Sequence, residues 1–313
     1  MKNVATEDHV KRVFVTGASG FVGRHFCRLL EASPDWHAVA APEAFDLRSD
    51  DSIANTLTAA GRIDAVLHLA AQSSVPQSFA DPQATFDINF LGTLRLLHGL
   101  KARDFGGRFI YVGTADAYGL VPANELPVPE DRALRPRNPY AVSKVAAEAL
   151  VYQWAQSEGL NAVLVRPFNH IGPGQDERFA VGTFARQFAE MALGRREPRL
   201  QVGDLDVTRD FTDVRDVARA YRELLTRGDP GSVYNIGSGS ETRLRDIVGA
   251  LGALAGIQPH IVVDSSRLRP AEQRRMAADT SRVRLALGWH PQYRLEQTLE
   301  DLYKEWKERL AHD

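Results

Sequence analysis

Short apolar runs alternate with segments of helical periodicity along the first half of the chain. The run at 13–15 ends in glycines, and residues 21–31 then repeat at helical spacing. The same pattern predicts further strands at 37–41, 65–69, 109–112 and 162–165, and helices at 83–100 and 139–158. Strands rich in Val, Leu and Ile that alternate with helices indicate right-handed βαβ crossovers around a buried sheet. We therefore predict an α/β fold with a doubly wound parallel Rossmann sheet over residues 1–168.

The pattern becomes less regular after Pro167, where glycine, proline and charge interrupt the apolar runs. Helices are predicted at about 179–193, 213–227, 243–255 and 295–310, with an apolar run at 233–236 and a basic loop at 266–275. These pieces are too discontinuous to form a free-standing core. We expect residues 169–313 to form a smaller substrate-binding lobe, partly interleaved with the first domain. Its expected place is over the carboxyl ends of the strands, where ligands of open α/β folds bind.

Charge and composition exclude several classes of protein. The formal net charge is −2 and the pI is about 6.5, so no basic excess is present to hold nucleic acid. No stretch approaches the apolar length of a transmembrane helix, and the polar first ten residues resemble neither a signal peptide nor an anchor. The single cysteine, Cys27, suits a reducing compartment and is expected to be a core side chain. We therefore expect a cytoplasmic protein without a membrane partner. The scattered histidines predict no metal site.

Glycines at spacing three and three follow the first predicted strand, in the segment TGASGFVG at 16–23. Gly17, Gly20 and Gly23 allow a tight turn, a close approach of the backbone to a pyrophosphate, and packing of the helix on the strand. The N-terminus of the following helix supplies free N–H groups to the phosphates. Such turns are common in purely structural roles, but here the strand and the helix that the motif requires are both predicted. The segment indicates an NAD or NADP site.

The end of the second predicted strand does not separate NAD from NADP. An acid there would bind the ribose 2′-hydroxyl of NAD, and Glu43 is close to this position without sitting at the strand tip. No arginine stands there for a 2′-phosphate. Asp46 and Leu47 are better placed to hold the adenine edge. The sequence therefore leaves open whether the protein uses NADH or NADPH.

Tyr140 and Lys144 lie four residues apart near the start of a predicted helix, so they share one face. A lysine cation and the charge of a nicotinamide favour phenolate and lower the pKa of the tyrosine. The phenol then exchanges a proton with a carbinol oxygen while hydride moves to or from the nicotinamide. Thr114, just after a predicted strand, is the candidate for a hydroxyl that holds the same oxygen. An ordinary surface pair is the alternative, but the order of glycine turn, Ala70-Ala71, Asn89, Thr114 and Tyr140 favours catalysis.

These features together resemble the extended short-chain dehydrogenase/reductases, the group of nucleotide-sugar epimerases and dehydratases, from Val13 to about Trp306. The resemblance implies a catalytic triad of Thr114, Tyr140 and Lys144, with Lys144 on the nicotinamide ribose. It also implies that Asn89 supports the active-site helix. The cofactor-binding residues implied are Gly17, Ser19, Gly20, Phe21, Val22, Gly23, Asp46, Leu47, Leu69, Ala70, Ala71, Asn89, Tyr140, Lys144 and Pro167.

The residues after the threonine bear on the type of reaction. Dehydratases of this family carry an Asp–Glu or Ser–Glu pair there, whereas this chain has Ala115 and the shorter Asp116. The aspartate side chain is one methylene shorter than glutamate, so its carboxylate does not extend far enough for the proton transfer. This difference argues against a lyase. Two roles stay open for Asp116: a hydrogen bond to the sugar, or a cap on the local turn.

Segments 166–175, 206–211 and 269–273 look like the branch of the family that reduces a GDP-4-keto-6-deoxysugar. The resemblance implies that Asn169 contacts the sugar diphosphate, that Arg209 and Arg269 hold phosphates, and that Glu272 binds the GDP ribose. These residue types suit the ligand, because guanidinium groups pair with phosphates and a carboxylate accepts from a diol. The expected substrate partner is therefore a GDP-sugar, and residues 169–313 are expected to bind it. The resemblance also implies a homodimer through the helices at 83–100 and 139–158.

We therefore expect transfer of hydride from NAD(P)H to the 4-keto carbon of GDP-4-keto-6-deoxy-D-mannose, which yields GDP-D-rhamnose. The alternative enzyme is a 4-epimerase or 4,6-dehydratase that recycles its NAD. A regulator that only senses a dinucleotide is a remote third possibility, because such proteins commonly lose the tyrosine or the lysine. The stereochemistry at carbon 4, rhamnose against 6-deoxytalose, stays open.

Overall fold

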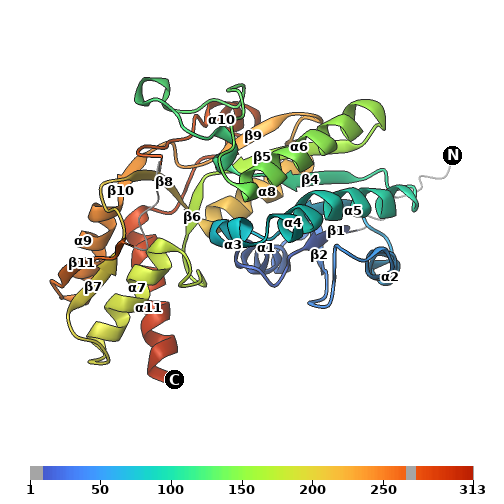
Figure 1. The fold of residues 1–313 in the computed structure, drawn as a ribbon. Coiled ribbons are helices and arrows are strands. Elements are labelled where there is room, and N and C mark those ends of the chain that lie inside the picture. Colours follow the sequence, from blue (N-terminus) through green and yellow to red (C-terminus); the bar gives the residue numbers. More distant parts are fainter. Residues whose placement is uncertain (1–9, 266–272, 313) are drawn as a thin grey trace.

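The computed structural model describes residues 10–265 and 273–312. A six-stranded sheet with the order β2-β1-β3-β4-β5-β9 forms its centre, and every neighbouring pair of strands is parallel (Figure 1). The strands are β1 (Lys11–Thr16), β2 (Trp36–Ala40), β3 (Ala65–His68), β4 (Arg108–Val112), β5 (Asn161–Pro167) and β9 (Val233–Ile236). The predicted doubly wound parallel sheet is confirmed.

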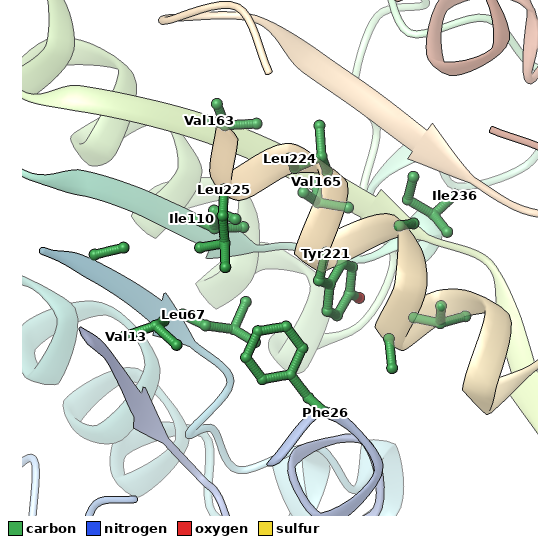
Figure 2. Close-up of a cluster of buried hydrophobic side chains, with 14 of the residues drawn as sticks. Val13, Phe26, Leu67, Ile110, Val163, Val165, Tyr221, Leu224, Leu225 and Ile236 are labelled. Atoms are coloured by element: carbon green, nitrogen blue, oxygen red, sulfur yellow. The ribbon is translucent and has the colours of Figure 1, made fainter. Parts of the chain in front are cut away.

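Helices cover both faces of this sheet because its strands are apolar on both sides. Alternate residues of β1 enter different cores, Val13 and Val15 on one face and Phe14 on the other. Figure 2 shows the first face, where Phe26 and Tyr221 pack against the strand residue Leu67. The helices of the first face are α1 (Phe21–Glu31), α8 (Val214–Arg227) and α10 (Ser281–Leu287), and those of the second are α2 (Asp50–Ala60), α5 (Gly92–Lys101) and α6 (Pro139–Ser157).

Two elements of the first domain differ from the sequence prediction. Helix α2 was not predicted, although Ser49 caps it by accepting a hydrogen bond from Ser52 N at 3.1 Å and Asp50 and Asp51 occupy its first turn. The single helix predicted at 83–100 is instead α4 (Pro82–Phe86), a π-helical turn η1 (Asp87–Leu91) and α5. A π turn inserts an extra residue into a helix, and such turns often mark functional sites. The short helix α3 (Val75–Ala80) precedes α4.

The second lobe combines helices with two small sheets (Figure 1). Its elements are β6 (Asn169–Ile171), α7 (Ala180–Ala192), β7 (Arg199–Val202), β8 (Thr208–Asp213), β10 (Glu241–Arg243), α9 (Leu244–Ala255), β11 (His260–Val263) and α11 (Leu295–His312). Phe188, Leu251 and Leu302 belong to a hydrophobic core of its own. The expectation that this lobe has no core was wrong, because residues from segments far apart in the chain complete it.

The chain crosses between the two parts more than once. Helix α8 and strand β9 follow residue 168, yet they pack on and complete the six-stranded sheet. The helix α10 also follows residue 168 and packs on the first face of this sheet. The division at residue 168 stays a prediction, and these three elements return to the first domain. Strand β6 begins two residues after β5 ends, so the second lobe starts at the carboxyl edge of the sheet. Within the described ranges, no helix combines the length and apolar character needed to span a bilayer.

Candidate active site

The glycine turn after β1 packs closely against the segment after β3. Gly17 has φ of +69°, and a Cβ there would lie 2.9 Å from Ala70 N, so only glycine fits without strain. The hydroxyl of Thr16 accepts hydrogen bonds from Leu69 N and Ala70 N, both at 3.1 Å. Gly20 caps α1 without a side-chain partner, which leaves N–H groups of the first turn for an anion. The turn therefore fits the pyrophosphate of a dinucleotide.

His68 lies directly beneath this turn at the end of β3. Its Nδ1 is 2.8 Å from the Thr16 hydroxyl and its Nε2 is 3.0 Å from the Thr93 hydroxyl. Burial lowers the pKa of His68 to about 3, with a smaller contribution from the Lys144 charge. The histidine is a core residue with both ring nitrogens satisfied.

Helix α6 carries Tyr140 and Lys144, and hydrogen bonds fix the position of its first turns. Asn138 caps the helix by accepting a hydrogen bond from Ala141 N at 2.7 Å. Asn89, in the π-helical turn, donates to the Ser143 hydroxyl at 2.9 Å and exchanges two hydrogen bonds with the backbone of Gln72. Asn89, 54 residues before Ser143 in the sequence, is thus joined to the helix start that carries Tyr140 and Lys144.

Thr114 meets Tyr140 from the end of β4. The threonine hydroxyl accepts a hydrogen bond from Asp116 N at 3.2 Å and thereby caps the short 3₁₀ turn η2 (Ala115–Tyr118). Thr114, rather than Asp116, therefore caps this turn. The hydrogen bond between Asp116 and the sugar stays a prediction. The side chain of Asp116 lies close enough to Tyr140 for its charge to act on the phenol.

The pKa of Tyr140 differs in direction from the sequence argument, which expected Lys144 to lower it. Burial raises the pKa of Tyr140, the charge of Asp116 raises it further, and a hydrogen bond with Thr114 opposes the rise. A raised pKa keeps the phenol protonated, which is the form that a proton donor needs. The correction arises because the burial of the phenol and the acid beside it are tertiary features.

Lys144 is buried among aromatic and polar groups. Its Nζ lies 4.6 Å from the ring centroid of Tyr111, whose hydroxyl donates to the Lys144 carbonyl oxygen at 2.9 Å. Burial lowers the pKa of Lys144 to about 7, and the nearby Glu148 opposes this fall. The charge of this lysine at neutral pH therefore depends on its neighbours.

The predicted adenine-binding residues lie between β2 and α2. Arg48 donates to both carboxylate oxygens of Asp46, at 3.0 Å each, and holds the pKa of Asp46 below its usual range. Leu47 is buried and Glu43 is exposed. No arginine was expected near the strand tip, so Arg48, two residues after Asp46, was missed as a cation in this loop.

The predicted substrate residues are divided between the two lobes. Asn169 opens β6, and Arg209 lies on the neighbouring β8, where its Nη1 donates to the Thr208 carbonyl oxygen at 2.8 Å. Pro167, which was predicted to bind the cofactor, ends β5 opposite Ile236 of β9. Arg269 and Glu272 lie outside the described residues.

Contacts that the sequence analysis did not find join α1 to the segment after β6. Phe21 stacks on His170 with ring centroids 5.9 Å apart. His25 Nε2 lies 2.8 Å from the Pro173 carbonyl oxygen, and Arg24 donates to the Gly174 carbonyl oxygen at 3.2 Å. The helix of the glycine turn is thereby tied to the start of the second lobe. The only feature of the sequence that could have indicated these contacts is the glycine- and proline-rich segment at 172–174.

A glycine turn that opens a Rossmann sheet, together with a threonine, a tyrosine and a lysine at its carboxyl edge, defines an NAD(P)-dependent short-chain dehydrogenase/reductase. Residues 42–302 match the family model described as "GDP-mannose 4,6 dehydratase", and the chain belongs to this family of nucleotide-sugar enzymes. GDP-6-deoxy-D-mannose reductase of Pseudomonas aeruginosa is 45% identical over 97% of this chain and 99% of that protein.

Two further comparisons agree with this family. The solved structure of RMD from Pseudomonas aeruginosa complexed with NADPH superimposes with a TM-score of 0.91 at 45% identity, over 96% of this chain and 100% of that one. UDP-glucose 4-epimerase of Mycolicibacterium smegmatis is 31% identical over 91% of this chain and 95% of that protein. The predicted family and the NAD(P)-dependent class of enzyme are confirmed.

Proposed function

We infer that this protein reduces the 4-keto group of GDP-4-keto-6-deoxy-D-mannose to give GDP-D-rhamnose. The observation that carries the inference is 45% identity over nearly the whole of both chains to a GDP-6-deoxy-D-mannose reductase. A bound NADPH or NADH supplies the hydride, and NADPH is the dinucleotide in the similar solved structure. The protein supplies the site for both ligands and the proton.

The proposed proton donor is Tyr140, which protonates the sugar oxygen as carbon 4 receives the hydride. Its raised pKa keeps the proton on the phenol until negative charge develops on that oxygen. Thr114, in hydrogen-bond contact with Tyr140, is proposed to hold the same oxygen. Lys144 is proposed to bind the nicotinamide ribose and to stabilise the charge that remains on the phenol.

The remaining binding roles follow the family resemblance and the geometry. The glycine turn and Leu69-Ala70-Ala71 are proposed to line the dinucleotide, with Asp46 and Leu47 at the adenine and Pro167 near the nicotinamide. Asp116, Asn169 and Arg209 are proposed to bind the GDP-sugar, together with Arg269 and Glu272. Asp116 and Asn169 are supported by their position just after β4 and β5, at the carboxyl edge of the sheet, where open α/β folds bind ligands. Arg209 is supported by its place on β8, which pairs with the strand that Asn169 opens. Arg269 and Glu272 are proposed from the family resemblance alone.

The family also contains dehydratases and epimerases, which return the hydride to their product. Ala115 and Asp116 stand where a dehydratase carries its acid and its longer glutamate, so this chain has a shorter carboxylate for the removal of water. That shorter reach supports reduction over dehydration.

The test supplies the purified protein with GDP-4-keto-6-deoxy-D-mannose and either NADPH or NADH. Reduction consumes one dinucleotide for each sugar, which the loss of absorbance at 340 nm records, and NMR of the product assigns carbon 4. An epimerase or dehydratase would show no net consumption. If neither cofactor is oxidised, the reductase proposal is wrong.

We also propose a homodimer through α6 and the helical segment that α4, the π turn and α5 form together. Leu91 and Val142, one from each segment, are large apolar side chains that remain exposed in the monomer. Light scattering should give about twice the chain mass of 34.6 kDa. The double variant Leu91→Glu/Val142→Glu should be monomeric, and a wild-type monomer would contradict the proposal.

A further inference from the structure

Glu148 lies one helical turn beyond Lys144 on α6, and the proposed chemistry does not use it. Tyr140, Lys144 and Glu148 follow at intervals of four, so they lie along one side of the helix. Glu148 and Lys144 are both buried. Burial of a charged group is unfavourable unless the group is paired, so the surroundings of this carboxylate need explanation.

Arg166 of β5 holds the carboxylate of Glu148. Its Nε lies 3.2 and 3.1 Å from the two carboxylate oxygens, and its Nη2 donates to Oε1 at 2.5 Å. Its Nη1 donates to the Tyr118 hydroxyl at 3.0 Å and to the Glu130 carbonyl oxygen at 2.8 Å. The Tyr118 hydroxyl donates in turn to Asn235 at 2.6 Å. The arginine is therefore fixed from several elements and fixes Glu148 in one position.

The same carboxylate lies beside the segment that leads to Thr114. A Cβ at Gly113 would stand 3.1 Å from Glu148 Oε2 and 3.0 Å from the Val165 carbonyl oxygen. Gly113 N also donates to that carbonyl oxygen at 2.7 Å. Tyr118, at the other end of the turn that Thr114 caps, contacts Arg166. The pair Glu148–Arg166 thus adjoins the elements of all three proposed catalytic residues.

Glu148 is the negative charge that acts on Lys144. The other titratable groups near the lysine are His68 of β3, Tyr111 of β4 and Tyr140 of α6. All three are neutral at pH 7, because burial lowers the pKa of the histidine and raises the pKa of both tyrosines. Among the described residues, Glu148 is the charged group whose field opposes the effect of burial on Lys144.

We propose that Glu148, fixed by Arg166, is a positioning residue that keeps the Lys144 ammonium charged and in place beside Tyr140. The ion pair with Arg166 prevents the Glu148 carboxylate from rotating to form a direct ion pair with Lys144. Such a pair would move the ammonium group away from the proposed cofactor site. The inference rests on the proposed function of Lys144, which needs a cation. The carboxylate that holds this charge is itself bound by Arg166.

The direct test measures the titration of Lys144 in the protein without a dinucleotide. The chain has only six lysines, so ¹³C NMR at the lysine Cε resolves them, and Lys144→Arg identifies the resonance. Glu148→Gln keeps the shape of the side chain and should lower the pKa of Lys144 by at least about one unit. Glu158→Gln is the matched control, because this glutamate follows α6 but pairs with Lys101 at the surface. An unchanged titration in Glu148→Gln overturns the proposal.

A kinetic measurement separates this role from a merely structural one. In Glu148→Gln, the fall of kcat/KM on the basic side should begin at lower pH by the same interval, and activity should recover as the pH is lowered. Glu148→Asp keeps the charge and should restore most of the wild-type profile. A loss of activity that is uniform across pH overturns the proposal. A shifted NMR titration without turnover of the keto-sugar would instead refute the proposed function.

A second variant covers the possibility that Glu148→Gln does not fold with Arg166 left unpaired. The double variant Glu148→Gln/Arg166→Met leaves no unpaired buried charge, and replacement of buried ion pairs in this way is often tolerated. It should also lower the pKa of Lys144, because Glu148 is the charge that acts on the lysine. A wild-type titration in the double variant overturns the proposal.

Discussion

The phenol of Tyr140 combines two features, a hydrogen bond with Thr114 and a pKa raised by burial and by Asp116. Tyr140→Phe removes the proton donor but keeps the ring, so turnover should fall by about 10² to 10⁴-fold while the affinity for NADPH changes little. Steady-state kinetics and NADPH fluorescence titration measure the two effects. Tyr152→Phe, an exposed position on the same helix, should behave as wild type. Substantial activity in Tyr140→Phe would refute the proton-donor role.

His68 makes the stability of the fold depend on pH. Its pKa is about 3 in the folded protein and 6.5 in the unfolded chain, so only the unfolded chain binds this proton between those values. The contribution to stability is present above pH 6.5 and is lost as the pH falls, by roughly 2 kcal/mol at pH 5.

Urea unfolding at pH 7 and pH 5 tests the His68 contribution. His68→Gln keeps a donor and an acceptor for Thr16 and Thr93 but does not titrate, so its stability should fall less between the two pH values. The same substitution at the exposed His37 is the matched control. An equal decrease in His68→Gln and wild type would show that another group is responsible.

Helix α6 presents its catalytic residues in the first two turns, so its cap bears on both stability and activity. Asn138→Ala removes the hydrogen bond to Ala141 N and should lower the free energy of unfolding by about 1 kcal/mol. Fraying of the first turn also loosens Tyr140, so kcat should fall several-fold. Asp81→Ala removes the equivalent cap of α4 and should leave kcat unchanged. An Asn138→Ala enzyme with unchanged kcat would contradict the link between cap and catalysis.

The two lobes are joined by buried carboxylates at the start of α8. Asp216 is fully buried and accepts hydrogen bonds from Gln292 N at 3.0 Å, from Tyr293 N at 2.9 Å and from Arg219. It thereby ties the segment before α11 to the first domain.

Asp216→Ala leaves these donors without their acceptor and should lower the free energy of unfolding by about 2–4 kcal/mol in urea denaturation. Asp246→Ala, an exposed position on α9, should cost less than about 0.5 kcal/mol. A small effect at Asp216 would mean that the two lobes are held together by other contacts.

Much of the architecture follows from local pattern. The apolar runs predicted the first five of the central strands, and the glycine spacing predicted the turn that packs on Ala70. The sixth, β9, was seen only as an apolar run and was assigned to the second lobe. Helix α2 was missed because its apolar side is small, with Ile53 and Leu57 as its large buried residues. The π turn was missed because a uniform helical period does not show a single inserted residue.

The amino-acid sequence by itself determined the parallel sheet, the glycine turn and the shared helix face of Tyr140 and Lys144, since each depends on spacing within a short segment. Only the tertiary structure decided which distant polar groups pair. Thr16 meets His68 across 52 residues and Asn89 meets Ser143 across 54. Such pairs depend on how elements pack, and so do the burial and neighbouring charges that set the pKa values of Tyr140 and Lys144.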